Sequence, residues 1–258
     1  MIQIAAHPRP FPHAGLTRGE TALILIDMQR DFLEAGGYLD AMGYDLAGVR
    51  AAIRPAHRLL DAARAGGLTI LHTRQGYRPD LAEMPPHRLA RVQAGTSSVG
   101  KPGPLGRFLI RGEPGFQIIA DLAPAPGEFV IDKTANSAFW GTDLAAILAA
   151  RGIRALIFAG VTTDVCVHCT LREANDRGFE CLVAQDACGS GDAQAHRAAL
   201  HMVTVEDGVF GVLADVDTIV AALDRMDRAL AKTAPILPKA AAPTSPPAPA
   251  GDLGDWSI

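Results

Sequence analysis

The sequence is poor in cysteine and has no long apolar run. Four cysteines in 258 residues are too few for the disulfide framework of a small secreted domain. No stretch approaches the roughly 20 consecutive apolar residues that a membrane-spanning helix needs. The first residues, MIQIAAHPRPFPHAG, lack the basic start and apolar core of a signal peptide. We therefore expect a cytoplasmic protein with reduced thiols and no membrane partner.

An excess of positive charge is also missing. Lys and Arg number 24 against 28 Asp and Glu, a net charge of −4, so nucleic acid is not an expected partner. Residues 20–231 are long enough to bury one sizeable core as a single domain. Residues 1–19 carry three prolines and are predicted to form an irregular arm. Residues 232–258 are rich in Ala and Pro, which predicts a tail without a core.

Short apolar runs alternate with segments of helical spacing along the domain. We predict strands at residues 21–26, 68–73, 128–133, 155–159, 180–185 and 203–206. We predict helices at residues 47–65, 117–122, 143–150, 194–202 and 216–231, and one from residue 166 onward. This alternation predicts an α/β protein with a three-layer α/β/α architecture and a doubly wound, mostly parallel six-stranded sheet of Rossmann-like topology. Residues 76–116, rich in Gly and Pro, are predicted to form a long functional or interfacial loop.

Three of the predicted strands lead into residues that could carry chemistry. Asp27 directly follows residues 21–26, Lys133 ends residues 128–133, and Cys166 follows the turn after residues 155–159. The carboxyl ends of parallel strands meet at one edge, where ligands bind in such folds. A thiol in the first turn of a helix has a lowered pKa, an aspartate can take its proton, and a lysine can hold charge. Polar residues commonly end strands, and Asp27 could instead cap a turn, so spacing alone leaves the triad open.

Two other readings involve the cysteines. Cys166 and Cys169 form a C-x-x-C pair, the spacing of thiol oxidoreductases, although in those folds it follows the first strand of a smaller domain. Zinc could be bound by Cys166, His168, Cys169 and Cys188, but the sequence lacks the spacing of a zinc knuckle. A binding module without activity is a further alternative.

Three segments carry a family resemblance: ALILIDMQRDF, VIDK and GVTTDVCVHCTLREANDRGFECLVAQDACG. Over roughly residues 18–223 the chain resembles the isochorismatase-like cysteine hydrolase family. The resemblance implies a catalytic triad of Asp27, Lys133 and Cys166. It also implies a cis peptide bond between Val161 and Thr162, and an oxyanion hole formed by the backbone N–H groups of Thr162 and Cys166. Members that act as isochorismatases lack the cysteine, so its presence indicates amide cleavage.

The same resemblance bears on cofactors and assembly. Nicotinamidases of this family carry an aspartate–histidine metal site after the second strand, whereas this chain has HTRQGYRPD there. We therefore expect no metal and no cofactor. The resemblance implies a homo-oligomer, often a tetramer.

Within the family, the segments GGYLDAMGYDL, RGEPGFQII, TDVCV and DGVFG most resemble biuret hydrolases, and ureidoacrylate hydrolases share GGYLD and the triad. The biuret-like reading implies cleavage of a small ureide with release of ammonia through a thioester acyl-enzyme. The expected pocket residues are Phe32, Asn136, Phe139 and Glu206. A substrate-contacting glutamine of biuret hydrolases falls at Glu206, and a lysine falls at Asn136. Because a carboxylate only accepts hydrogen bonds, Glu206 favours donor-rich substrates such as triuret or guanylurea.

Overall fold

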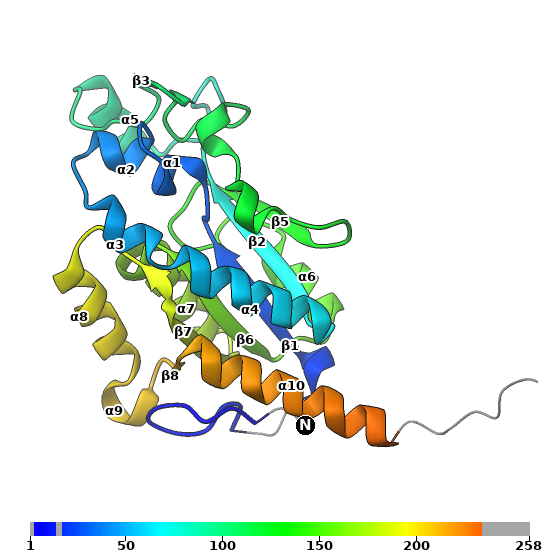
Figure 1. The fold of residues 1–258 in the computed structure, drawn as a ribbon. Coiled ribbons are helices and arrows are strands. Elements are labelled where there is room, and N and C mark those ends of the chain that lie inside the picture. The colour runs from blue at the N-terminus through cyan, green and yellow to red at the C-terminus, as the bar shows by residue number, and fades with distance from the viewer. Residues whose placement is uncertain (1–2, 14–16, 234–258) are drawn as a thin grey trace, which may run out of the picture.

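A parallel sheet forms the centre of the computed structural model, which describes residues 3–13 and 17–233 (Figure 1). In this part of the chain, the sheet has six strands in the order β5-β2-β1-β6-β7-β8, and each neighbouring pair is parallel. The strands are β1 (Thr21–Ile26), β2 (Thr69–Gln75), β5 (Phe129–Lys133), β6 (Ala155–Val161), β7 (Glu180–Gly189) and β8 (Val212–Ala214). This confirms the predicted doubly wound α/β fold.

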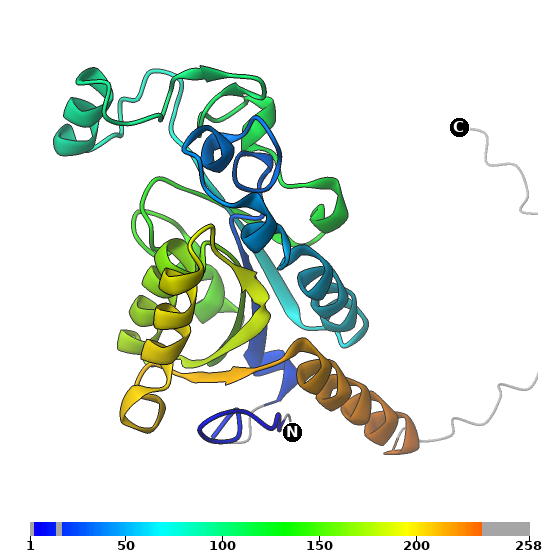
Figure 2. The ribbon, with the colours of Figure 1, turned by 60° about the vertical axis from the view of Figure 1, so that its left-hand side comes forward.

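Helices cover both faces of the sheet (Figure 2). On one face, α4 (Ile53–Ala65) and α10 (Val216–Thr233) share an apolar cluster with Leu23 and Leu25, alternate residues of β1. On the other face, α6 (Leu144–Ala150), α7 (His168–Asp176) and α8 (Ala193–Val203) share a second apolar cluster with the remaining β1 residues. Because β1 and β6 are buried on both sides, their sequences are continuous apolar runs without alternation.

The predicted helix at residues 47–65 forms as two elements, α3 (Leu46–Arg50) and α4. Ala51 and Ala52 between them keep helical backbone angles. Pro55 has no N–H, so the hydrogen bond that would reach the carbonyl of Ala51 cannot form. A proline in the first turn of α4 is compatible with a helix start, and the chain therefore continues in nearly the same direction.

The predicted sixth strand at residues 203–206 is wrong. Val203 is the last residue of α8, and residues Val205–Gly208 form the short helix α9, with left-handed backbone angles at Glu206 and Asp207. The sixth strand is β8, further along the chain. The apolar residues there are too few for periodicity to separate a helix end from a strand.

Residues 76–116 fold into a small lobe rather than a featureless loop (Figure 2). The lobe contains α5 (Pro86–Gln93), the hairpin of β3 (Pro102–Gly103) and β4 (Gly106–Arg107), and a 3₁₀ turn at Pro114–Phe116. Tyr77, Met84 and Ile110 form its apolar centre. The predicted helix at residues 117–122 is reduced to a 3₁₀ turn at Ala120–Leu122.

The N-terminal arm lies along the free edge of β8, where His7 and Leu213 exchange two backbone hydrogen bonds of 2.8 Å each. The predicted Ala- and Pro-rich tail lies outside the described residues from residue 234 onward. Within the described ranges, no helix combines the length and apolar character needed to cross a bilayer.

Candidate active site

Lys133 contacts both of the other residues that the sequence singled out, Asp27 and Cys166. Its Nζ lies 2.7 Å from Oδ2 of Asp27 and 3.4 Å from Sγ of Cys166. All three side chains are buried, with Asp27 at 0% and Lys133 at 1% exposure. The strand order explains the meeting: the chain runs outward from β1 to β2 and β5, then returns to β6 on the other side of β1. The site therefore lies at the switch point of the sheet, where ligands bind in doubly wound folds.

Asp27 is held by the end of the neighbouring strand. It has a left-handed backbone, with φ of 49°, a conformation that Asp tolerates better than most residues with a Cβ. The hydroxyl of Thr73 on β2 donates to Oδ1 of Asp27 at 2.6 Å and accepts from the Asp27 N–H at 3.1 Å. One carboxylate oxygen therefore faces β2, and the other faces Lys133.

Gln75 fixes the position of Lys133. The two residues are direct partners in the register of β2 and β5, and Oε1 of Gln75 accepts from Lys133 Nζ at 2.8 Å. The carbonyl of Ala135 accepts from the same ammonium at 3.1 Å. Gln75 ends β2, two residues beyond the strand predicted at residues 68–73, and its neutral side chain carried no signal of its own in the sequence.

Cys166 lies in a π-helical turn, η4 (Thr163–Val167), that precedes α7. The peptide bond between Val161 and Thr162 is cis, as the resemblance implied. Thr170 on α7 donates to the Cys166 carbonyl at 2.7 Å and accepts from the Ala138 N–H at 3.1 Å. This hydroxyl ties the cysteine turn to the loop that follows Lys133.

The electrostatics of the thiol differ from the sequence-based expectation. Burial raises the pKa of Cys166 to about 12; Lys133 acts to lower it, but Asp27, within hydrogen-bonding reach, raises it further. The prediction that a helix N-terminus lowers this pKa is therefore wrong, because desolvation of a buried thiolate outweighs the helix dipole. Burial opposes the charge of Lys133, but Asp27 and Cys166 raise its pKa above its ordinary value. The resting site thus holds a thiol beside an ion pair.

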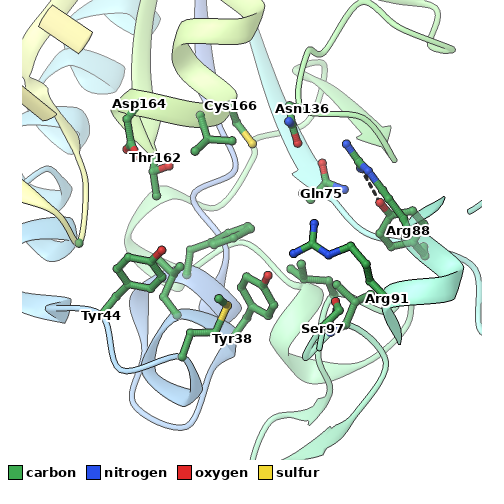
Figure 3. A pocket seen from close by; sticks show the side chains of 18 of the residues that line it. Tyr38, Tyr44, Gln75, Arg88, Arg91, Ser97, Asn136, Thr162, Asp164 and Cys166 are labelled. Atoms are coloured by element: carbon green, nitrogen blue, oxygen red, sulfur yellow. Dashed lines mark hydrogen bonds between the residues drawn. The ribbon is translucent and has the colours of Figure 1, made fainter. Parts of the chain in front are cut away.

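A cavity of about 330 Å³ opens in front of Cys166 (Figure 3). Its lining comes from the cysteine turn, from α1 (Arg30–Leu33) and α2 (Tyr38–Ala41), and from the 76–116 lobe. Phe32 and Asn136, two of the expected pocket residues, line it, and so does Thr162. The lining also includes side chains that the sequence analysis did not assign to the pocket: Tyr38, Tyr44, Gln75, Tyr77, Arg88, Arg91 and Asp164. The lobe residues were missed because no local pattern shows which way a long excursion folds back.

Two predicted pocket residues lie elsewhere. Phe139 is buried in the core, where its ring stacks on Phe179 with centroids 6.0 Å apart. Glu206 is exposed on α9, between the end of α8 and the start of β8. Because α8 returns the chain from the carboxyl edge of the sheet to the amino edge, Glu206 lies far from the cavity (Figure 1). Its charge therefore gives no reason to expect triuret or guanylurea.

The cysteines show neither a disulfide nor a metal centre. Cys166, Cys169, Cys181 and Cys188 are all free thiols. Residues 3–13 and 17–233 contain no group of three or more His, Cys, Asp or Glu side chains that could hold a metal ion. His72, the histidine near the end of β2, has a structural role and is not a metal ligand in this arrangement. Its buried Nε2 lies 2.8 Å from Oε2 of Glu128, and burial lowers the pKa of the imidazole.

The sequence and the fold are similar to those of known proteins. The isochorismatase domain family matches residues 21–218. The chain is 32% identical to the ureidoacrylate amidohydrolase RutB of Azorhizobium caulinodans, over 82% of this chain and 94% of that enzyme. It is 33% identical to the RutB of Variovorax paradoxus, over 82% and 84% of the two chains. A crystal structure of a cysteine hydrolase from Pseudomonas syringae pv. phaseolicola superposes with a TM-score of 0.70 and 25% identity, covering 81% of this chain and 95% of that one. The chain therefore belongs to the isochorismatase family and is an isochorismatase-like cysteine hydrolase.

Proposed function

We propose that this enzyme is a cysteine-dependent amidohydrolase that cleaves a C–N bond of a small ureido compound. The observation that carries the proposal is the contact of one buried ammonium, Lys133 Nζ, with both Asp27 and Cys166. A nucleophile, a proton acceptor and a fixed cation in contact meet the geometric requirement for covalent catalysis. A cavity of about 330 Å³ is at the small end of ligand sites and fits a small molecule.

The proposed reaction begins with the neutral thiol. Asp27 takes the thiol proton as sulfur bonds to the substrate carbonyl carbon, so no free thiolate has to persist in the buried site. The N–H groups of Thr162 and Cys166 hold the oxyanion that forms. The C–N bond then breaks, and the nitrogen leaves as an amine or ammonia with the proton from Asp27.

The second half of the proposed reaction restores the enzyme. Water gives a proton to Asp27, and its oxygen attacks the acyl carbon bound to sulfur. The C–S bond breaks, and the Cys166 sulfur recovers the proton. Lys133 stays protonated throughout, because Asp27, Gln75 and the Ala135 carbonyl hold its N–H groups.

Ureidoacrylate is the first candidate substrate. Relatives that are 32% and 33% identical over most of both chains are named ureidoacrylate amidohydrolases, and this outweighs the short segments that resemble biuret hydrolases. Biuret is the second candidate, because of those segments. Both compounds present a terminal carbamoyl carbon to a thiol.

The test is hydrolysis of ureidoacrylate and biuret by the purified protein, followed as loss of substrate and release of ammonia. Cys166→Ser should lower kcat by about 1,000-fold or more. Cys169→Ser, at a free thiol three residues further along the chain on α7, should retain most of the wild-type kcat. Equal activity of Cys166→Ser and wild type would refute the mechanism. Disulfide reductase activity lost in Cys169→Ser would instead favour a thiol oxidoreductase.

Assembly and location also remain proposals. We propose a homo-oligomer, as the family resemblance implies, and light scattering on the purified protein tests it. A cytoplasmic location is likewise proposed, and fractionation of the source cells tests it.

A further inference from the structure

Two arginines of α5 line the same cavity as Cys166. Arg88 and Arg91 are three residues apart, so they lie on one side of the helix. Figure 3 shows both guanidinium groups at the cavity, with that of Arg91 directed into it below Gln75 and Asn136. The mechanism proposed above uses neither residue.

Neither arginine is neutralised by a described residue. Arg88 donates to the Tyr77 hydroxyl at 2.7 Å and to the Thr134 carbonyl at 3.1 Å, and both partners are neutral. Arg91 forms no ion pair or side-chain hydrogen bond within residues 3–13 and 17–233. Other arginines of the lobe do have carboxylate partners: Arg107 lies 3.2 Å from Glu113, and Arg111 lies 4.0 Å from Glu83. Among the described arginines of the lobe, the two without a carboxylate partner are therefore the two that line the cavity.

The cavity also has a negative side. Asp164 is the one acidic side chain among the described residues of its lining, and it comes from the cysteine turn, on the side of Cys166 away from α5 (Figure 3). Its Oδ1 is buried with no hydrogen-bond partner in the described part of the chain. Like charges repel and opposite charges attract, so an anionic ligand is oriented with its negative end toward α5.

We propose that Arg88 and Arg91 form a carboxylate-binding subsite, so that the enzyme selects ureido compounds with a carboxylate over neutral ureides. This inference rests on the proposed function for the identity of the ureido end, which lies at Cys166. A guanidinium presents a planar fork of N–H donors that matches a carboxylate. Arg88 is held in place by Tyr77 and Thr134, and Arg91 is free to close on the ligand. The subsite therefore favours ureidoacrylate, an anion, over neutral biuret.

The experiment measures binding without turnover. The probes are 3-ureidopropionate and its neutral amide, 3-ureidopropionamide, which differ in charge at one end and match in length. Calorimetry on the Cys166→Ser protein should show that it binds the acid more tightly than the amide. Adding Arg91→Met should weaken binding of the acid by about 10- to 100-fold, as for loss of a charge-assisted hydrogen bond. Binding of the amide should change by less than about twofold.

The matched control is Arg78→Met in the same background. Arg78 belongs to the same lobe and carries the same charge, but its partner is Asp80 at 3.5 Å, and it does not line the cavity. Arg78→Met should leave the affinities for 3-ureidopropionate and for 3-ureidopropionamide unchanged. Arg91→Lys keeps the charge without the fork and should give an intermediate affinity for the acid.

Each outcome decides between the possibilities. The subsite would be overturned if the protein bound the acid and the amide with equal affinity, or did not bind the acid. It would also be overturned if Arg91→Met weakened binding of the acid and binding of the amide equally. Failure of the proposed function has a different signature: wild type would hydrolyse neither ureidoacrylate nor biuret, while the acid–amide difference in binding remains measurable. Turnover of biuret without an acid–amide difference would keep the function and reject the subsite.

Discussion

Gln29 and Gln75 hold each other by a pair of hydrogen bonds. The amide oxygen of Gln29 accepts from the Gln75 N–H at 2.6 Å, and Nε2 of Gln29 donates to the Gln75 carbonyl at 3.1 Å. The same Nε2 also donates to the Phe116 carbonyl at 2.9 Å. Gln75 in turn accepts from Lys133. The position of the Lys133 ammonium therefore depends on the buried side-chain amide of Gln29, which does not contact Lys133 itself.

Gln29→Met should weaken both stability and activity. The near-isosteric side chain leaves the buried Gln75 N–H and two carbonyls without their partner, which should cost roughly 2–4 kcal/mol of unfolding free energy. Because Gln75 then loses its anchor, kcat should fall about tenfold or more. Denaturant unfolding and steady-state kinetics measure the two effects. Gln117→Met, at an exposed position, is the control, and equal behaviour of both variants would contradict the prediction.

Lys133→Met should be inactive and strongly destabilised. It leaves the fully buried Asp27 carboxylate without its cation, and breaking a buried ion pair in this way costs about 3–5 kcal/mol. The double variant Asp27→Asn with Lys133→Met should regain much of that stability but no activity. Chemical denaturation of the three proteins checks this. A single variant as stable as wild type would show that the pair is not energetically coupled.

Alkylation of Cys166 by iodoacetamide should be slow near neutral pH. With a thiol pKa of about 12, the thiolate fraction at about pH 8 is only about 10⁻⁴, and the rate should rise about tenfold per pH unit toward alkaline pH. Mass spectrometry of labelled peptides follows the reaction, with Cys166→Ala as the control. A rate that levels off below about pH 9 would indicate a thiolate already formed beside Lys133.

Glu128→Gln should remove stability that depends on pH. Burial acts to raise the pKa of Glu128, but hydrogen bonds from Arg64, the Ala125 N–H and His72 lower it from 4.5 to about 2. A carboxyl group whose pKa is lowered in the folded state stabilises the fold at pH values above its unfolded-state pKa. This contribution to stability is lost as the pH falls through the folded-state pKa. The stability gap between wild type and variant should therefore be full near neutral pH and close between 4.5 and about 2.

Unfolding curves at several pH values measure this gap. Glu34→Gln, which breaks a half-buried surface pair with Arg30, should cost less than about 1 kcal/mol. A gap for Glu128→Gln that stays constant down to strongly acidic pH would contradict the assignment.

Gly160→Ala should damage the fold next to Asp27. Gly160 has φ of +123°, and a Cβ there would lie 2.1 Å from the carbonyl oxygen of Ile26, the residue that precedes Asp27. We expect a loss of more than about 4 kcal/mol, since backbone and not a flexible side chain blocks the site. Gly152→Ala also has a positive φ but open space around it, and should lose only about 1 kcal/mol. Thermal unfolding of the two variants compares them directly.

Much of this site could be predicted because its residues follow apolar strands. Asp27, Lys133 and Cys166 each come at or shortly after the carboxyl end of a strand of the sheet, and parallel strands place these ends along one edge. Gln75 ends β2 in the same way, but a neutral amide gives no chemical signal. Glu206 was assigned to the pocket from the resemblance to biuret hydrolases, and the structure places it on α9 instead.

The sequence by itself determined the α/β alternation, five of the six strands of the sheet and the chemistry-bearing residues at their carboxyl ends, because local periodicity and apolar runs encode these features. Only the tertiary structure decided the rest. Burial raised the pKa of the Cys166 thiol, which a helix N-terminus alone would lower. The return of the 76–116 lobe over the cavity brought Arg88 and Arg91 to the site. Desolvation and long-range chain return depend on contacts between residues distant in sequence, and no local pattern records them.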